Sequence, residues 1–137
     1  MNEFKYIPKE FWPSVEEHIQ HETVYRGVKS TNILHVDDFL PWNIENSNQM
    51  KKFNGLFKQP YFGTSVFTNL ENLRSVVKNF PALGTKIKAY AVGFTSIEKG
   101  ISKKENLNNH VDYYLYDYIN NSPKDDFNIL EVRKYEK

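Results

Sequence analysis

Alternation of hydrophobic and polar side chains along the chain predicts a series of β-strands. One strand is expected at residues 86–94, where side chains two apart share one face of the extended backbone. Further extended segments are expected at residues 23–28, 61–67, 97–101, 111–119 and 127–135. Most of these segments lie in the second half of the chain, where they follow one another without intervening helical patterns.

Apolar side chains spaced three or four residues apart predict helices elsewhere. Residues 8–20 carry Phe11, Val15 and Ile19 four apart, which places them on one helical face. Pro13 falls within the first turns of this predicted helix, where its missing N–H costs little. The sequence therefore predicts an N-terminal helix.

A second helix is expected at residues 70–79. The preceding residues Thr68-Asn69-Leu70-Glu71 have the form of a capping box, and Pro81 and Gly84 are expected to end the helix. A short third helix is expected within residues 50–57. The order of elements indicates a single α+β domain over residues 1–137, with a mostly antiparallel sheet, an N-terminal helix and one or two further helices.

Composition narrows the class of protein. The 137 residues suit one domain, and aromatic residues, at 15%, supply large rings for its core. The chain contains no Cys, which excludes disulfides, thiolate metal sites and cysteine nucleophiles. It has no apolar signal segment and no run of the ~18 apolar residues that would span a bilayer. A cytoplasmic protein without membrane contact is expected.

Charge argues against a nucleic-acid partner. The 18 Lys and Arg residues balance 17 Asp and Glu residues. A nucleic-acid binder that uses Lys51, Lys52, Lys58 and nearby aromatic side chains is the weakest hypothesis, because the net charge is near zero. His18 and His21 do not have the spacing of a metal site, so no metal is expected.

The segment Val24-Tyr25-Arg26-Gly27-Val28 places a guanidinium on an otherwise apolar strand. Arginine presents planar donors that suit phosphate or carboxylate groups, and Gly27 would let a ligand lie against the backbone. The structural alternative is an arginine at a strand edge, paired with an acid or exposed.

A second candidate segment contains Gly63, Thr64 and Ser65 and leads into the capped helix. Its hydroxyl groups would hydrogen-bond a ribose or orient another side chain, and the helix N-terminus would attract an anion. The alternative is an ordinary buried strand in which small residues leave room for packing.

A third candidate is Glu131, which strict alternation places on one face with Phe127 and Ile129. A carboxylate on an apolar face has either a partner or a chemical role. Arg26 or Arg133 would be that partner. The alternative is an edge strand with both faces exposed to water.

The aromatic segment at residues 109–118 is a further place for chemistry. His110 and Asp112 share one side of the expected strand, where they would act as acid and base or contact a ligand. Tyrosines such as Tyr114 would form a stacking surface for a base. The alternative is an aromatic core strand capped by a solvated histidine.

Together these segments resemble the ADP-ribosyltransferase superfamily, in its families with an Arg-Ser-Glu signature. Tyr25-Arg26-Gly27 matches the aromatic-Arg-Gly of the first core strand, and Gly63-Thr64-Ser65 stands where a Ser-Thr-Ser strand would follow. Glu131 is the glutamate of a later strand. The resemblance implies an NAD-handling domain that transfers ADP-ribose or hydrolyses NAD.

The resemblance also implies roles for individual residues. Arg26 would hold the NAD phosphates or the nicotinamide ribose, Ser65 would orient the site, and Glu131 would stabilise positive charge at the ribose carbon. Tyr25, Phe67 or Tyr90 would stack on nicotinamide. The remaining candidate ligand contacts are Gly27, Gly63, Thr64, His110, Asp112 and Tyr114. All three catalytic candidates are expected to converge on one cleft.

A second interpretation is a non-catalytic module that binds a nucleotide or a protein, such as a host-interaction protein or a regulator of bacterial or phage origin. The paired Glu-x-Glu of many transferases is absent, because Glu131-Val132-Arg133 supplies only one glutamate. The abundance of Tyr and Phe suits a binding surface.

Overall fold

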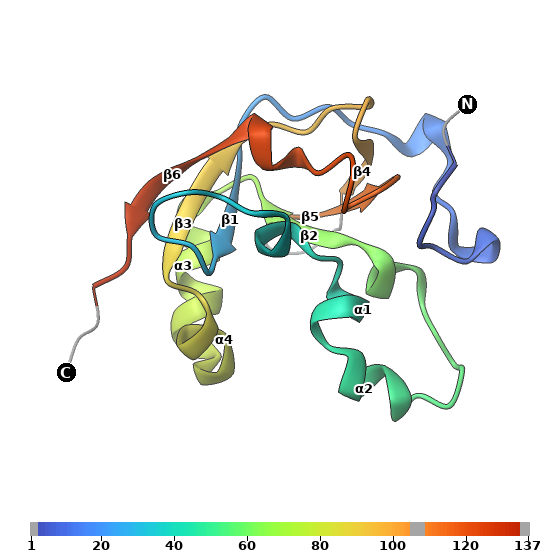
Figure 1. The fold of residues 1–137 in the computed structure, drawn as a ribbon, viewed down its shortest axis with the longest axis horizontal. Coiled ribbons are helices and arrows are strands. Elements are labelled where there is room, and N and C mark those ends of the chain that lie inside the picture. Colours follow the sequence, from blue (N-terminus) through green and yellow to red (C-terminus); the bar gives the residue numbers. More distant parts are fainter. Residues whose placement is uncertain (1–2, 105–108, 135–137) are drawn as a thin grey trace.

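A six-stranded antiparallel sheet organises the protein (Figure 1). The computed structural model describes residues 3–104 and 109–134. The strands lie in the order β4-β5-β2-β1-β3-β6, and all neighbouring pairs are antiparallel. Their bounds are β1 Val24–Val28, β2 Thr64–Phe67, β3 Ala89–Gly93, β4 Gly100–Lys104, β5 His110–Leu115 and β6 Phe127–Val132. The predicted α+β class with an antiparallel sheet is confirmed.

The sheet consists of two halves with a narrow junction. The register between β1 and β2 contains a single pair, Tyr25 with Phe67. By contrast, β1 and β3 share five register pairs, and β2 and β5 share four. The backbones of β1 and β2 therefore have few hydrogen bonds to each other beyond this pair, and other groups must satisfy their polar atoms.

Helices flank both halves. Their bounds are α1 Trp42–Glu45, α2 Ser47–Lys51, α3 Leu70–Asn79 and α4 Pro81–Lys86, and the 3-10 turns are η1 Lys9–Phe11, η2 Val15–Glu17, η3 Val36–Phe39, η4 Gln59–Phe62 and η5 Pro123–Asp126. In Figure 1, α3 and α4 lie under the β1–β3 half, and α1 and α2 form a separate lobe beside β2. The cleft described below has walls from both groups.

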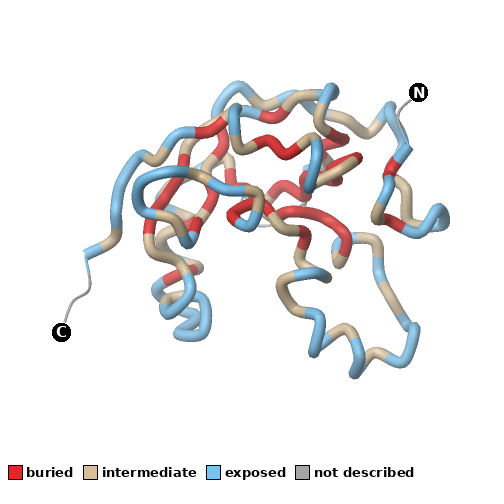
Figure 2. The backbone as a smooth tube through the Cα atoms, viewed as in Figure 1, coloured by how far each residue is buried: buried red, intermediate tan, exposed pale blue. Residues whose placement is uncertain are grey.

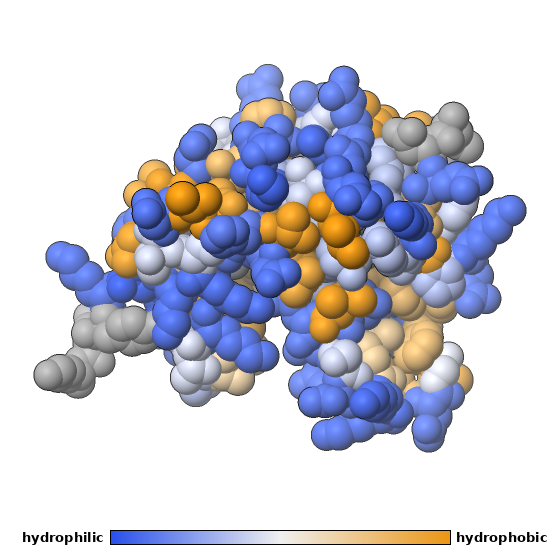
Figure 3. Space-filling model, viewed as in Figure 1, coloured by the Kyte–Doolittle hydropathy of each residue, from blue (hydrophilic) through white to orange (hydrophobic). Residues whose placement is uncertain are grey.

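Each face of the sheet buries its own apolar side chains. On the face that carries Arg26, the buried cluster comprises Val24, Val28, Phe39, Val66, Ala89, Ala91, Val111 and Phe127. On the opposite face, Leu73 and Val77 of α3 pack against Phe67 and Tyr90. Figure 2 shows buried residues concentrated along the strands, and Figure 3 shows apolar surface in separate patches among hydrophilic side chains.

The helix at residues 70–79 is present as predicted, but its ends differ in detail. Asn69, not Thr68, is the N-cap, and its side chain accepts a hydrogen bond from the N–H of Asn72. Pro81 begins α4 instead of ending the helical region, because proline suits the first position of a new helix. The two consecutive helices supply one wall of the cleft.

The predicted N-terminal helix at residues 8–20 is wrong. The segment forms only the short turns η1 and η2, and Val15 and Ile19 are each 47% exposed. Trp12 adopts an extended conformation before Pro13, because the proline ring disfavours helical geometry in the residue that precedes it. Ser14 then caps the next turn. Apolar spacing alone did not outweigh this backbone constraint.

The helix predicted within residues 50–57 lies earlier in the chain, as α1 and α2. Asn54 and Gly55 both have positive φ, at 52° and 81°, which ends helical structure before residue 57. Aromatic contacts hold the lobe instead. The ring centroid of Tyr61 lies 5.2 Å from that of Trp42 and 4.9 Å from that of Phe53, which stacks on it.

The N-terminal segment lies along the edge strand β4. The N–H of Ile19 donates to the carbonyl of Ser102 at 2.9 Å, and the N–H of Ser102 donates to His18 Nδ1 at 3.0 Å. Burial lowers the pKa of His18 and keeps its ring neutral, as an acceptor at Nδ1 requires. Within residues 3–104 and 109–134, no helix is long and apolar enough to cross a bilayer.

Candidate functional site

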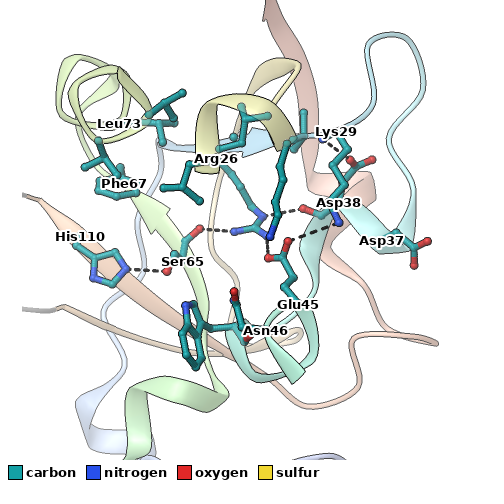
Figure 4. A pocket seen from close by; sticks show the side chains of 18 residues that line it. Arg26, Lys29, Asp37, Asp38, Glu45, Asn46, Ser65, Phe67, Leu73 and His110 are labelled. Atoms are coloured by element: carbon teal, nitrogen blue, oxygen red, sulfur yellow. Dashed lines mark hydrogen bonds and ion pairs between the residues drawn. The ribbon is translucent and has the colours of Figure 1, made fainter. Parts of the chain in front are cut away.

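A cleft of about 410 Å³ opens where the two halves of the sheet meet. Its polar wall comes from β1, the α1 lobe and the start of β5, and its apolar wall comes from α3 and α4 (Figure 4). The apolar lining includes Phe67, Leu73, Val76, Val77, Leu83 and Ile87. The cleft therefore offers one wall to a flat or hydrophobic group and one wall to hydroxyl or anionic groups.

Arg26 is the centre of the polar wall. Its Nε donates to the carbonyl of Asp38 at 2.7 Å, and its Nη1 donates to the carbonyl of Ser65 at 2.7 Å. Its Nη2 donates to Glu45 Oε1 at 3.0 Å and lies 3.5 Å from the carbonyl of Leu40. The guanidinium thus satisfies backbone carbonyls where β1 and β2 diverge, and it joins β1 to η3, α1 and β2.

Glu45 places a carboxylate between two cations. Its Oε1 accepts from Arg26, and its Oε2 lies 3.6 Å from Lys29 Nζ. The Arg26 side chain is 9% exposed, whereas that of Glu45 is 24% exposed. Glu45 therefore neutralises a nearly buried charge from the open side of the cleft.

Asp38 fixes the loop that follows β1. Its carboxylate accepts from the N–H groups of Lys29, Ser30 and His35 and from the Ser30 hydroxyl, at 2.6–3.0 Å. Burial acts to raise the pKa of Asp38, but these hydrogen bonds outweigh burial and leave the pKa below its usual value. Asp38 is therefore a structural anion that holds the loop after β1.

Ser65, His110 and Asp112 lie side by side on β2 and β5. His110 Nε2 is 2.9 Å from Ser65 Oγ and 3.6 Å from Asp112 Oδ1. A Ser-His-Asp relay needs the acid and the hydroxyl on different ring nitrogens, and here both approach Nε2. The arrangement therefore suits the orientation of a polar ligand group and not proton relay to a serine nucleophile.

The structure brings five of the candidate residues to the cleft. Arg26, Gly27, Ser65, Phe67 and His110 all line it. The predicted convergence of Arg26 and Ser65 is thus observed, although they meet through the carbonyl of Ser65 and not its hydroxyl.

Glu131 does not join them, and the expectation of one cleft for all three catalytic candidates is wrong. In β6, Ile129 is the register partner of Ala91, but Glu131 is the partner of Tyr90, so Leu130 is an extra residue in a β-bulge. The bulge turns Glu131 to the face opposite Arg26. There it forms an ion pair with Arg74, not with Arg26 or Arg133, and lines a separate hollow.

Several predicted ligand contacts are core residues instead. Tyr90 is 5% exposed and belongs to the α3 cluster, and Tyr114 is fully buried in another cluster. Thr64 is buried and donates to the carbonyl of Phe39 at 3.0 Å. Tyr25 packs on the α3 cluster, and Asp112 is 2% exposed beside His110. The structural alternative for the aromatic strand is therefore correct for its tyrosines.

The candidate glycines Gly27 and Gly63 make room for neighbouring protein atoms and not for a ligand. A Cβ added at Gly27 would lie 2.5 Å from Cδ1 of Ile87. One added at Gly63 would lie 3.0 Å from the Cβ of Asp112 and 3.3 Å from Tyr114. Both glycines thus allow close packing within the sheet and its helices.

Most residues that line the cleft were not singled out from the sequence as ligand contacts, and Lys29, Trp42 and Glu45 are among them. Lys29 directly follows β1, whereas Trp42 and Glu45 line the cleft only because the lobe folds back against β1. No periodic pattern marks them, since α1 has only four residues. Among the residues that the structure describes, no three His, Asp or Glu side chains gather as metal ligands would.

No family model, curated protein or solved structure matches this chain. The resemblance to ADP-ribosyltransferases therefore depends only on the residues quoted above.

Proposed function

We propose that the cleft binds NAD or a related ADP-ribose nucleotide, and that the domain acts by binding this ligand without turning it over. The observation that carries the proposal is the convergence of Arg26, Ser65 and Phe67, all candidates from the transferase resemblance, on one two-sided cleft.

The two walls match the two kinds of group in such a nucleotide. A planar base or nicotinamide ring would lie along the apolar wall, beside the ring pair of His110 and Phe67, whose centroids are 5.3 Å apart. Ribose hydroxyls would meet Ser65 and His110, which are donors or acceptors as required. Phosphate groups would lie toward Arg26 and Lys29.

The position of Glu131 favours binding over transfer. In the families that this sequence resembles, the glutamate supports positive charge at the ribose carbon as nicotinamide leaves. Here the Glu131 carboxylate forms an ion pair with Arg74 at a separate hollow, on the face of the sheet opposite Arg26. We therefore expect nucleotide binding without release of nicotinamide.

Thermal unfolding with and without NAD or ADP-ribose tests the proposal. A ligand at 100 times its dissociation constant adds roughly 2.7 kcal/mol, which corresponds to a rise of a few degrees in Tm. We expect this rise in the wild-type protein and its loss in Leu83→Glu, which places a charge on the apolar wall. Leu56→Glu is the matched control, because Leu56 is 80% exposed and lies outside the cleft.

Two results would contradict the proposal. One is a wild-type Tm that neither nucleotide changes, and the other is an equal rise in both leucine variants. Release of free nicotinamide from NAD by the purified protein, measured by chromatography, would instead restore the enzymatic interpretation.

A further inference from the structure

Glu45 lies where two cations of the polar wall meet. Its carboxylate lies 3.0 Å from Nη2 of Arg26 and 3.6 Å from Nζ of Lys29 (Figure 4). Charge-assisted contacts of this kind are stronger than neutral ones, and burial of Arg26 increases their strength. Arg26 has no other carboxylate partner in the described parts of the chain.

The carboxylate belongs to an element that is weakly held. It is the last residue of α1, a helix of four residues with no buried side chain. The helix is attached through Trp42, whose N–H donates to the carbonyl of Gly63 and whose ring lies beside Tyr61. By comparison, Arg26 is anchored at 2.7 Å to the carbonyls of both Asp38 and Ser65. Arg26 is therefore fixed, whereas Lys29, with a side chain 47% exposed, and the Glu45 carboxylate are on parts that are easier to move.

We propose that Glu45 is an internal substitute for a ligand anion: Arg26 and Lys29 form a phosphate subsite, and a phosphate group of the ligand displaces the Glu45 carboxylate when it binds. The inference rests on the proposed function only in that both use the same cleft. It explains how Arg26 contributes to anion binding although most of its N–H groups are directed at carbonyls.

The displacement exchanges one anion for another on the same cations. The N–H of Arg26 Nη2 that now donates to Glu45 would donate to a phosphate oxygen, and Lys29 would turn to the same group. Glu45 would then be released into solvent, which its partial exposure allows. A neutral ligand gains nothing from this exchange, so the subsite selects phosphate-bearing ligands.

Binding of inorganic pyrophosphate and of ADP-ribose to Glu45→Gln, measured by calorimetry, tests the inference. Removal of the competing charge is expected to strengthen pyrophosphate binding about tenfold, the order of one charge-assisted hydrogen bond. Glu10→Gln is the matched control, because it removes the same charge from an exposed residue that lies outside the cleft. It is expected to leave pyrophosphate affinity unchanged.

A second measurement does not depend on the folding of that variant. The chain has two tryptophans, so Trp12→Phe leaves Trp42 as the only one. Because Trp42 and Glu45 are on the same short helix, pyrophosphate is expected to change Trp42 emission in this variant. The change should disappear when Lys29 is also replaced by Met.

The outcomes separate this inference from the proposed function. Weaker or unchanged pyrophosphate binding by Glu45→Gln, or unaltered Trp42 emission at saturating pyrophosphate, overturns the inference. If wild-type protein still binds ADP-ribose in that case, the proposed function stands. If Glu45→Gln gains pyrophosphate affinity but neither this variant nor the wild-type protein binds ADP-ribose, the subsite stands and the proposed function fails.

Discussion

Replacement of Arg26 by methionine tests whether this residue holds the two halves of the sheet together. Methionine keeps much of the length and volume of the side chain but removes every donor. The carbonyls of Asp38 and Ser65 lose their 2.7 Å partners, and Glu45 loses its ion pair with Arg26 and keeps only the longer one with Lys29. The contact to Leu40, at 3.5 Å, is too long to add much.

The expected cost follows from these three contacts. Hydrogen bonds with a charged donor contribute roughly 1.5 kcal/mol or more each, and breaking a buried ion pair costs about 3–5 kcal/mol in measured cases. Because Arg26 is 8% exposed and the contacts are shared, we expect the free energy of unfolding to fall by about 4 kcal/mol. At ~3 °C per kcal/mol for a chain of this size, Tm would fall by about 12 °C.

Urea denaturation of the variant beside Arg74→Met measures this effect. Arg74 also contacts two carboxylates, those of Glu71 and Glu131, but it does so on the surface. Surface ion pairs contribute little, so Arg74→Met is expected to unfold at nearly the wild-type urea concentration. An Arg26→Met protein as stable as Arg74→Met would refute the role assigned to Arg26 at the junction.

Three further predictions concern stability. Burial lowers the pKa of His18 from its usual 6.5, so the stability that the neutral ring provides is present above pH 6.5 and lost as pH falls. Chemical denaturation from pH 7.5 to 5.5 should therefore show a fall in the free energy of unfolding that is smaller in His18→Asn. An equal fall in this variant would exclude His18 as its origin. Burial raises the pKa of Asp126, so its contribution to stability is lost as pH rises through the folded pKa; Asp126→Asn should therefore raise Tm at pH 7, and a lower Tm would show that the carboxylate is needed. Gly100→Ala should lower Tm by several degrees, because the added Cβ would lie 2.1 Å from the carbonyl oxygen of Tyr114, and an unchanged Tm would mean that β4 and β5 separate there at little cost.

The sheet was predictable where local alternation agrees with burial. Val24, Arg26 and Val28 share a face as alternation requires, and α3 buries Leu73 and Val77 at the helical spacing expected of it. These elements depend on spacing that is written into consecutive residues. The prediction of an N-terminal helix was wrong because Pro13 favours an extended conformation at Trp12. This local constraint outweighed the helical spacing of the apolar residues.

The cleft was only partly predictable, because its assembly depends on contacts far apart in the sequence. Arg26 and Ser65 carry unusual chemistry on strands and are visible in the sequence. The bulge at Leu130 reverses the face of Glu131, and nothing in the alternating sequence marks that extra residue. Glu45 enters the cleft only because its short helix folds against β1.

The central claim is that the cleft at the junction of the two half-sheets binds an ADP-ribose nucleotide. Titration of ADP-ribose into isotopically labelled protein, followed by NMR, locates any binding directly. The largest amide shifts are expected at Lys29, Ser65, Phe67 and His110. Largest shifts at the hollow around Arg74 and Glu131, or no shifts at millimolar ADP-ribose, would contradict it.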